Sequence, residues 1–254
     1  FASLIEPAYK ATMSDLLDEK DYTKASGLVQ MAGASKFLIS PMLAGALLAV
    51  SDVKFLLLID ICTFFVTVAS TFAVRRGIKV KSVAAKEPML EALLLGWKEV
   101  TKNRGVLILV WMTSLLTFFM GFIQTLAMPM LLSFTTSTMA GMVETIVAVG
   151  MLISSMIMGM LNINKGYVKM LCISLLMSGA TMIVFGCREN LWVVSVAGFA
   201  FFATLPFANA ALDYLIRIHL DNEVQGRAWG LIGLISQMGY VVSYATCGLL
   251  ADYL

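Results

Sequence analysis

The sequence has few charged residues for its length. Only 13% of its 254 residues are Asp, Glu, Lys or Arg, whereas 59% are hydrophobic. A soluble domain carries about 25% charged residues, so this chain has too few to cover a surface that faces water. The composition predicts an all-α polytopic membrane protein.

Residues that bind metals or carry redox chemistry are also scarce. The four cysteines form no C-x-x-C pair, and the single histidine, His219, stands in a polar segment without a partner of its kind. We therefore expect buried packing thiols, no metal, no cofactor and no catalytic residues, so an enzyme is not predicted. The basic segment lacks interleaved aromatic residues, which argues against nucleic acid as a partner. The cysteines are Cys62, Cys172, Cys187 and Cys247.

Long apolar runs dominate what is present. Gly105–Phe134, for example, contains no charged side chain. About 20 apolar residues suffice to cross the hydrocarbon core of a bilayer, and seven complete spans of this kind are predicted, with residues 1–8 as the tail of an earlier one. The seven are Leu28–Val50, Val53–Val74, Val106–Met130, Ala140–Leu161, Val168–Cys187, Asn190–Tyr214 and Ala228–Leu250.

The basic residues lie on one side of these spans. Of the 18 Lys and Arg residues, 15 fall in alternate connections, and Arg75–Arg104 is the richest of these. Such asymmetry marks the cytoplasmic side of a membrane protein, so we expect a protein of the plasma membrane with its basic loops in the cytoplasm. The basic connections are Lys10–Lys24, Arg75–Arg104, Asn162–Lys169 and Leu215–Arg227.

The Arg75–Arg104 segment contains a helical pattern of its own. Pro88 suits the first position of a helix, and five apolar residues follow at a spacing that places them on one face. This pattern predicts an amphipathic helix over Pro88–Lys102 that lies on the membrane interface; a helix that binds a protein partner is the alternative. The apolar residues are Leu90, Leu93, Leu94, Trp97 and Val100.

A long basic linker with spans on both sides resembles the centre of a major facilitator superfamily transporter, which has six spans in each half. The resemblance implies a partial major facilitator fold that runs from the end of span four to span eleven. Residues 1–74 would end the amino-terminal half, residues 75–104 would form the cytoplasmic linker, and residues 105–254 would belong to the carboxy-terminal half.

Local motifs resemble the macrolide-efflux-like branch of drug:proton antiporters. The run Ser40-Pro41-Met42-Leu43-Ala44-Gly45 is similar to the family's glycine- and proline-containing fifth span, and Asp60 stands in a segment similar to its sixth span. Gln225-Gly226-Arg227 before the last span is also similar. The resemblance gives Pro41, Gly45, Gly226 and Arg227 structural or gating roles, while Asp60 is expected to form a hydrogen bond between helices.

The loop over Gly159–Lys169 resembles a decayed copy of the family's gating loop. Gly159, Gly166 and Lys169 are the candidates there, but Ile163 and Asn164 replace an acidic and a basic position. This departure from the motif puts a charge relay in this loop in doubt.

Polar residues inside the spans are the candidates for a substrate cavity. Thr117 and Gln124 lie in one span, Asn209 in another, and Gln237, Tyr240 and Tyr244 share one face of the last. The opposite face of that last span carries Ser236, Gly239, Ser243 and Thr246, which allow close helix packing. The alternative for each lone amide is a simple interhelical hydrogen bond.

Ionisable groups inside spans are costly and often functional. Glu144 and Asp213 are the coupling candidates, although each stands near a span end and can simply be solvated there. Lys36 has no assigned role, and Glu6 is a remnant candidate.

Together, the resemblance implies proton- or cation-coupled efflux of hydrophobic or amphipathic small molecules by alternating access. The expected partners are the bilayer, a small-molecule substrate and a coupling ion, which the resemblance implies is H+. A monomer is the expected state. The alternatives are a major facilitator importer or exporter of another substrate class, and a non-transporting membrane receptor or scaffold.

Overall fold

The computed structural model describes residues 17, 21–77, 89–161, 163 and 165–253. Residues 1–8, Pro88 and Asn164, which figure in the sequence predictions, lie outside this part. The described residues form eight helices. These helices are α2 (Tyr22–Val50), α3 (Val53–Gly77), α4 (Met89–Lys102), α5 (Arg104–Phe134), α6 (Ser137–Met160), α7 (Tyr167–Cys187), α8 (Leu191–Ile218) and α9 (Asn222–Tyr253).

The helix predictions are confirmed. Each of the seven predicted spans forms a helix, and the helix expected before Lys102 forms as α4. Five helices, α5 to α9, are long and apolar enough to cross a membrane, and α3 contains a shorter apolar stretch over Leu57–Ser70. The chain is therefore all-helical, with several helices of membrane-spanning length.

Polar side chains define where the long helices begin. Asn103 caps α5 by accepting a hydrogen bond from the backbone N–H of Gly105 at 2.9 Å. Asn190 caps α8 by accepting from the N–H groups of Trp192 and Val193. Such caps satisfy backbone donors that the first turn of a helix leaves without an internal partner.

The chain divides into two compact units, one of residues 1–34 and 88–254 and the other of residues 35–87. The smaller unit holds the second part of α2 and all of α3, joined at Ser51–Asp52. Phe64 and Phe65 on α3 are exposed, as is Asp60. The predicted division into transporter halves concerns function and stays a prediction.

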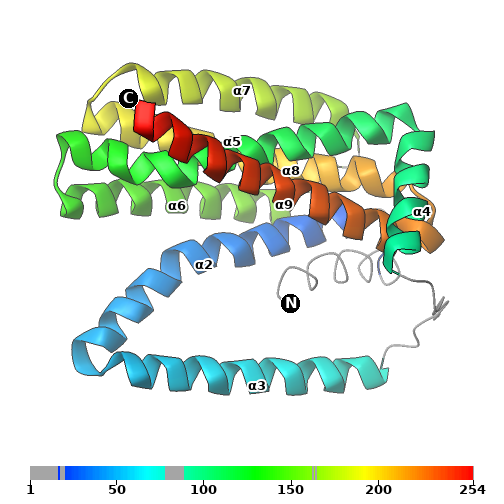
Figure 1. The fold of residues 1–254 in the computed structure, drawn as a ribbon, viewed down its shortest axis with the longest axis horizontal. Coiled ribbons are helices and arrows are strands. Elements are labelled where there is room, and N and C mark those ends of the chain that lie inside the picture. Colours follow the sequence, from blue (N-terminus) through cyan, green and yellow to red (C-terminus); the bar gives the residue numbers. More distant parts are fainter. Residues whose placement is uncertain (1–16, 18–20, 78–88, 162, 164, 254) are drawn as a thin grey trace. The chain divides into compact units, whose positions relative to one another are not determined.

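The larger unit contains an antiparallel bundle of α5 to α9 (Figure 1). Helix α8 packs against α6 and α7, and α5 packs against α9. We call the end where α5, α7 and α9 begin and α6 and α8 end the basic end, because its loops carry most of the basic residues of the described bundle.

The outer surface of this bundle is apolar. Trp192 is 79% exposed and Leu176 is 75% exposed, and large apolar side chains are exposed on every one of the five long helices. Soluble monomers rarely expose apolar patches of such extent, whereas lipid is a favourable environment for these side chains. The surface therefore agrees with the membrane-spanning length of the helices.

Small residues hold α5 and α9 together. A Cβ atom added to Gly121 would lie 2.7 Å from the Cβ of Ser243, and one added to Gly239 would lie 2.8 Å from the Oγ1 of Thr117. Lipid tails are as apolar as the side chains of the helices, so the hydrophobic effect does not drive helices together in lipid. Close van der Waals packing of small residues drives association instead. The predicted packing face of the last span is confirmed at Gly239 and Ser243.

Helix α4 runs across the basic end of α5 and α9 (Figure 1). A Cβ atom added to Gly96 would lie 3.0 Å from the backbone oxygen of Arg227, and Val100 is fully buried in a cluster with Trp229 and Ile232. The predicted apolar stripe is thus split, because Val100 faces the bundle while Leu94 and Trp97 remain exposed.

We expect Gly121→Ala to weaken the α5–α9 packing, because the new methyl group would overlap Ser243. Overpacking of this kind costs about 1–3 kcal/mol, which thermal unfolding of the purified protein in detergent measures as a lower midpoint. Gly179→Ala on α7 is the matched control, since its added Cβ meets nothing within 4 Å. Equal midpoints for the two variants would contradict the close packing.

Candidate functional site

A cluster of polar and aromatic side chains gathers at the basic end, where the first turns of α2 meet the bundle. We call it the basic-end cluster. It includes residues from four helices, of which α2 lies before the basic linker and the others lie after it. Its members are Tyr22, Thr23 and Ser26 of α2, Tyr167 of α7, Asp213, Tyr214 and Arg217 of α8, and Gln225 and Trp229 of α9.

The first contact joins α2 to α7. The hydroxyl oxygens of Thr23 and Tyr167 lie 2.7 Å apart, and both residues are buried. The Tyr167 hydroxyl donates to the backbone oxygen of Ile163. A phenol has only one proton to donate, so Thr23 donates to Tyr167, and the direction of the bond is fixed.

Tyr167 is held in place by a second aromatic ring. Its ring stacks on that of Tyr214 from α8, with centroids 3.6 Å apart and planes inclined by 16°. Stacking and the bond to Ile163 fix the hydroxyl that Thr23 meets. The α7–α8 pair therefore presents a rigid acceptor to α2.

The second contact joins α2 to α8. The Ser26 hydroxyl donates to Oδ2 of Asp213 at 3.2 Å. Asp213 is half-buried, and Ser26 is buried. The structure thus places the predicted coupling candidate Asp213 against a residue from the other side of the linker.

The third contact centres on Arg217, which is only 3% exposed. Its guanidinium carbon lies 5.0 Å from the ring centroid of Tyr22 and 5.6 Å from that of Trp229. A cation between two aromatic faces gains attraction from both, which helps to offset the cost of burying it. Arg217 therefore links α2, α8 and α9.

Sequence reasoning missed Arg217 because Leu215–Arg227 was expected to be a connection. That boundary is wrong: α8 continues to Ile218, and α9 begins at Asn222. The amide nitrogen of Gln225 donates to the backbone oxygens of Arg217 and Leu220 at 3.1 and 3.2 Å, and so closes the end of α8. The four-residue spacing of Asp213 and Arg217, which suits one helix face, was the available signal.

A backbone approach between two glycines brings α2 close enough for these contacts. A Cβ atom added to Gly27 would lie 2.6 Å from the backbone nitrogen of Gly159, near the end of α6. No side chain other than that of glycine fits at Gly27 without moving the helices apart. Gly159, predicted as a gating candidate, thus lies at the helix crossing.

A second group of predicted residues meets where α5 and α9 pack. The Tyr244 hydroxyl donates to Oε1 of Gln124 at 3.0 Å, and the rings of Tyr240 and Tyr244 have centroids 6.1 Å apart. Thr117 lies against Gly239 on the same pair of helices. The structure therefore brings Thr117, Gln124, Tyr240 and Tyr244 to one helix pair.

The remaining cavity and coupling candidates lie on α6, α8 and α9, and Gln237 stands on the same helix as Tyr240, three residues before it. Gln237 is exposed on α9, and Asn209 is half-buried on α8. Glu144 is exposed in the second turn of α6, which begins at the end of the bundle opposite the basic-end cluster. Of the two coupling candidates, Asp213 is the one in the basic-end cluster.

The other gating candidates differ in their surroundings. Gly166 precedes α7 with a φ of 84°, a left-handed conformation that favours glycine. Lys169 and Gly226 are exposed. The backbone of Arg227 lies in close contact with Gly96 of α4. Pro41 and Gly45 lie within α2, but their side-chain surroundings, like those of Lys36, are outside what is described.

Metal chemistry has no visible support in the described residues, which contain no group of three or more His, Cys, Asp or Glu side chains that could hold an ion. Cys62, Cys172 and Cys187 are exposed rather than buried, so the prediction of buried packing thiols is wrong for these three and confirmed for Cys247. Cys172 and Cys187 lie on α7, whose outer surface is apolar like that of the rest of the bundle.

We expect Gly27→Ala to push α2 away from α6 and to weaken the contacts of Thr23 and Ser26. Hydrogen exchange of the amides in residues 22–34 of the full-length protein should rise by about tenfold. Gly33→Ala on the same helix is the control, because its added Cβ meets nothing within 4 Å. Unchanged exchange in Gly27→Ala would refute the close crossing.

The chain was compared with protein-family models, curated proteins and solved structures. No family model, curated protein or solved structure matches it. The resemblance to the major facilitator superfamily remains a prediction from motifs.

Proposed function

We propose that the protein is a secondary active transporter of the major facilitator type that exports hydrophobic or amphipathic small molecules. The observation that carries this proposal is the basic-end cluster. There α2, which precedes the basic linker, packs through polar contacts on α7 and α8, which follow it. A transporter that works by alternating access needs such a contact between its halves at one end.

The chemistry of the cluster suits a contact that breaks and reforms. A hydrogen bond contributes about 0.5–1.5 kcal/mol net, and a cation–π contact contributes about 0.5–2 kcal/mol. The contacts of Thr23, Ser26 and Tyr22 therefore sum to a few kcal/mol. Two conformations separated by this much both remain accessible, and a ligand can shift their populations.

The group around Gln124 and Tyr244 supports the substrate class. Aromatic rings and amides side by side offer apolar contact area with a few hydrogen-bonding groups, which is the usual composition of small-molecule sites. Tyr244 and Gln124 are exposed in the described part of the chain. In the proposed transporter, these residues with Thr117, Gln237, Tyr240 and Asn209 line the carboxy-terminal side of the substrate cavity.

Asp213 is the proposed site at which the driving ion, H+, acts. As a carboxylate it accepts the hydrogen bond from Ser26. Protonation removes the negative charge and weakens that bond, because hydrogen bonds to charged groups are roughly twice as strong as neutral ones. Proton binding thereby favours release of α2 from the cluster.

In this proposal the basic end faces the cytoplasm and the protein lies in the plasma membrane as a monomer. The support is the distribution of Lys and Arg over the connections, since positive loops are retained on the cytoplasmic side. The basic-end cluster is then the inner gate.

The test is transport by the full-length protein in vesicles, with a panel of lipophilic dyes as probes and an imposed proton gradient. We expect gradient-driven movement of at least one dye above the rate in protein-free vesicles. Movement of no dye in the panel, with or without a gradient, would contradict export of this class and favour a receptor or scaffold.

We expect Asp213→Asn to reduce gradient-driven movement to the rate without a gradient, because the asparagine keeps the size of the side chain but cannot bind and release a proton. Glu144→Gln is the matched control, since Glu144 is exposed on α6 away from the cluster. If Glu144→Gln loses the gradient dependence and Asp213→Asn keeps it, the assignment of Asp213 fails.

A further inference from the structure

A hollow lies at the basic end between the α4–α5 junction and the α8–α9 turn. Its volume is about 370 Å³, near the lower limit of small-molecule sites. Charged side chains of both signs line it. The lining includes Glu99, Lys102, Asn103 and Arg104 on one side and His219 and Asp221 on the other.

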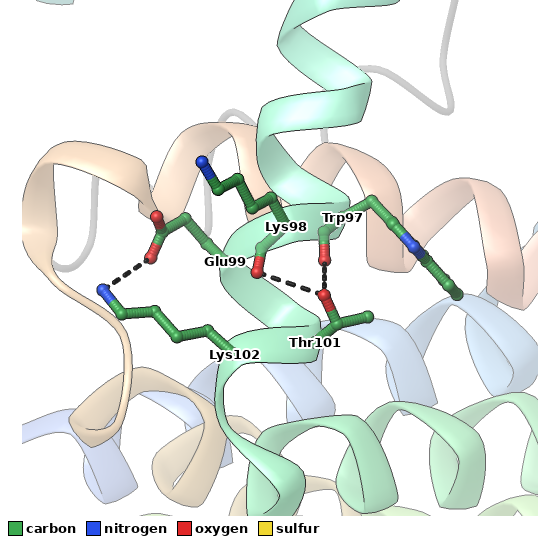
Figure 2. A network of polar contacts seen from close by, with 5 residues as sticks. All are labelled: Trp97, Lys98, Glu99, Thr101 and Lys102. Atoms are coloured by element: carbon green, nitrogen blue, oxygen red, sulfur yellow. Dashed lines mark hydrogen bonds and ion pairs between the residues drawn. The ribbon is translucent and has the colours of Figure 1, made fainter.

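The charges of this hollow balance each other. Lys102 and Arg104 are positive, and Glu99 and Asp221 are negative. Glu99 and Lys102 form an ion pair at 3.7 Å, which Figure 2 shows on one side of α4 with Trp97 pointing to the other. A ligand that carries both a positive and a negative group matches this lining better than a simple anion does.

The ring of His219 adds one more group to the lining. Its Nδ1 lies 2.7 Å from the backbone oxygen of Leu215. A backbone oxygen only accepts, so Nδ1 carries the proton and donates it, which leaves Nε2 as the ring atom available to a ligand. In the neutral ring, Nε2 accepts a hydrogen bond, for example from an ammonium group.

The position of α4 sets the depth of the hollow in the membrane. The helix crosses the ends of α5 and α9, which are long enough to span a bilayer (Figure 1). Leu94 is 61% exposed and Trp97 is 45% exposed on it. Exposed Trp beside charged residues is typical of the interface between headgroups and acyl chains.

We propose that the hollow binds the headgroup of an aminophospholipid, with the phosphate at Lys102 and Arg104 and the ammonium at Asp221 and His219. The primary ammonium matters because it donates hydrogen bonds to the carboxylate and the imidazole, which a quaternary ammonium cannot do. This inference rests on the membrane location of the helices and not on transport, so the two can fail separately.

The experiment compares lipid retention by the full-length protein in detergent, measured by native mass spectrometry. Phosphatidylethanolamine, phosphatidylcholine and phosphatidylglycerol with the same acyl chains are the probes. We expect phosphatidylethanolamine to be retained about tenfold over each of the others, as loss of one charge-assisted hydrogen bond predicts. Asp221→Asn should remove this preference, and Arg104→Gln should lower retention of all three lipids.

Lys98→Gln is the matched control, because Lys98 is an exposed cation on α4 that does not line the hollow. It should leave both retention and preference unchanged. Equal retention of the three lipids would overturn the proposal, as would a preference that survives Asp221→Asn. If Lys98→Gln and Lys102→Gln lower lipid retention equally, the proposal would also be overturned, because the lipids would then be held by the overall surface charge and not by the hollow.

Discussion

The backbone approach of Gly27 to Gly159 is the constraint on which the basic end of this protein depends. Because two glycines meet there, α2 comes close enough for Thr23 to reach Tyr167 and for Ser26 to reach Asp213. A larger residue at Gly27 would move α2 away from α6, and the hydrogen bonds of Thr23 and Ser26 would become too long to form. The polar contacts of the cluster therefore depend on the absence of a side chain at Gly27 and at Gly159.

The same principle operates in the bundle, but with a different outcome. Gly121 and Gly239 bring α5 and α9 together over an apolar length with few polar contacts, such as the bond between Tyr244 and Gln124. At the basic end, by contrast, several polar bonds and the buried cation Arg217 converge. Apolar packing suits a permanent interface in lipid, whereas polar groups that separate at an end of the bundle can exchange their hydrogen bonds for bonds to water.

Hydropathy and charge predicted the helices, because a run of about 20 apolar residues is typical of a membrane-spanning helix. The helical periodicity of the last span predicted that Gly239 and Ser243 pack. It placed Tyr240 and Tyr244 on the opposite face, which is wrong, because Tyr240 also lies beside Gly121 and Tyr244 forms a hydrogen bond with Gln124 on the same helix α5. Arg217 was missed because helix ends depend on tertiary hydrogen bonds, here those of Gln225, which local sequence does not reveal. The partner of Asp213 was missed for the same reason, since Ser26 lies far away in the chain.

Release of α2 from the bundle is the central claim, and the reactivity of a thiol at Ser26 tests it most directly. Ser26→Cys is made with Cys62, Cys172 and Cys187 changed to Ser, since these three are exposed. A membrane-impermeant thiol reagent should label it slowly at rest, because Ser26 is buried, and about tenfold faster when a proton gradient and a transported dye shift the population. Labelling at one constant rate under all these conditions would contradict the account.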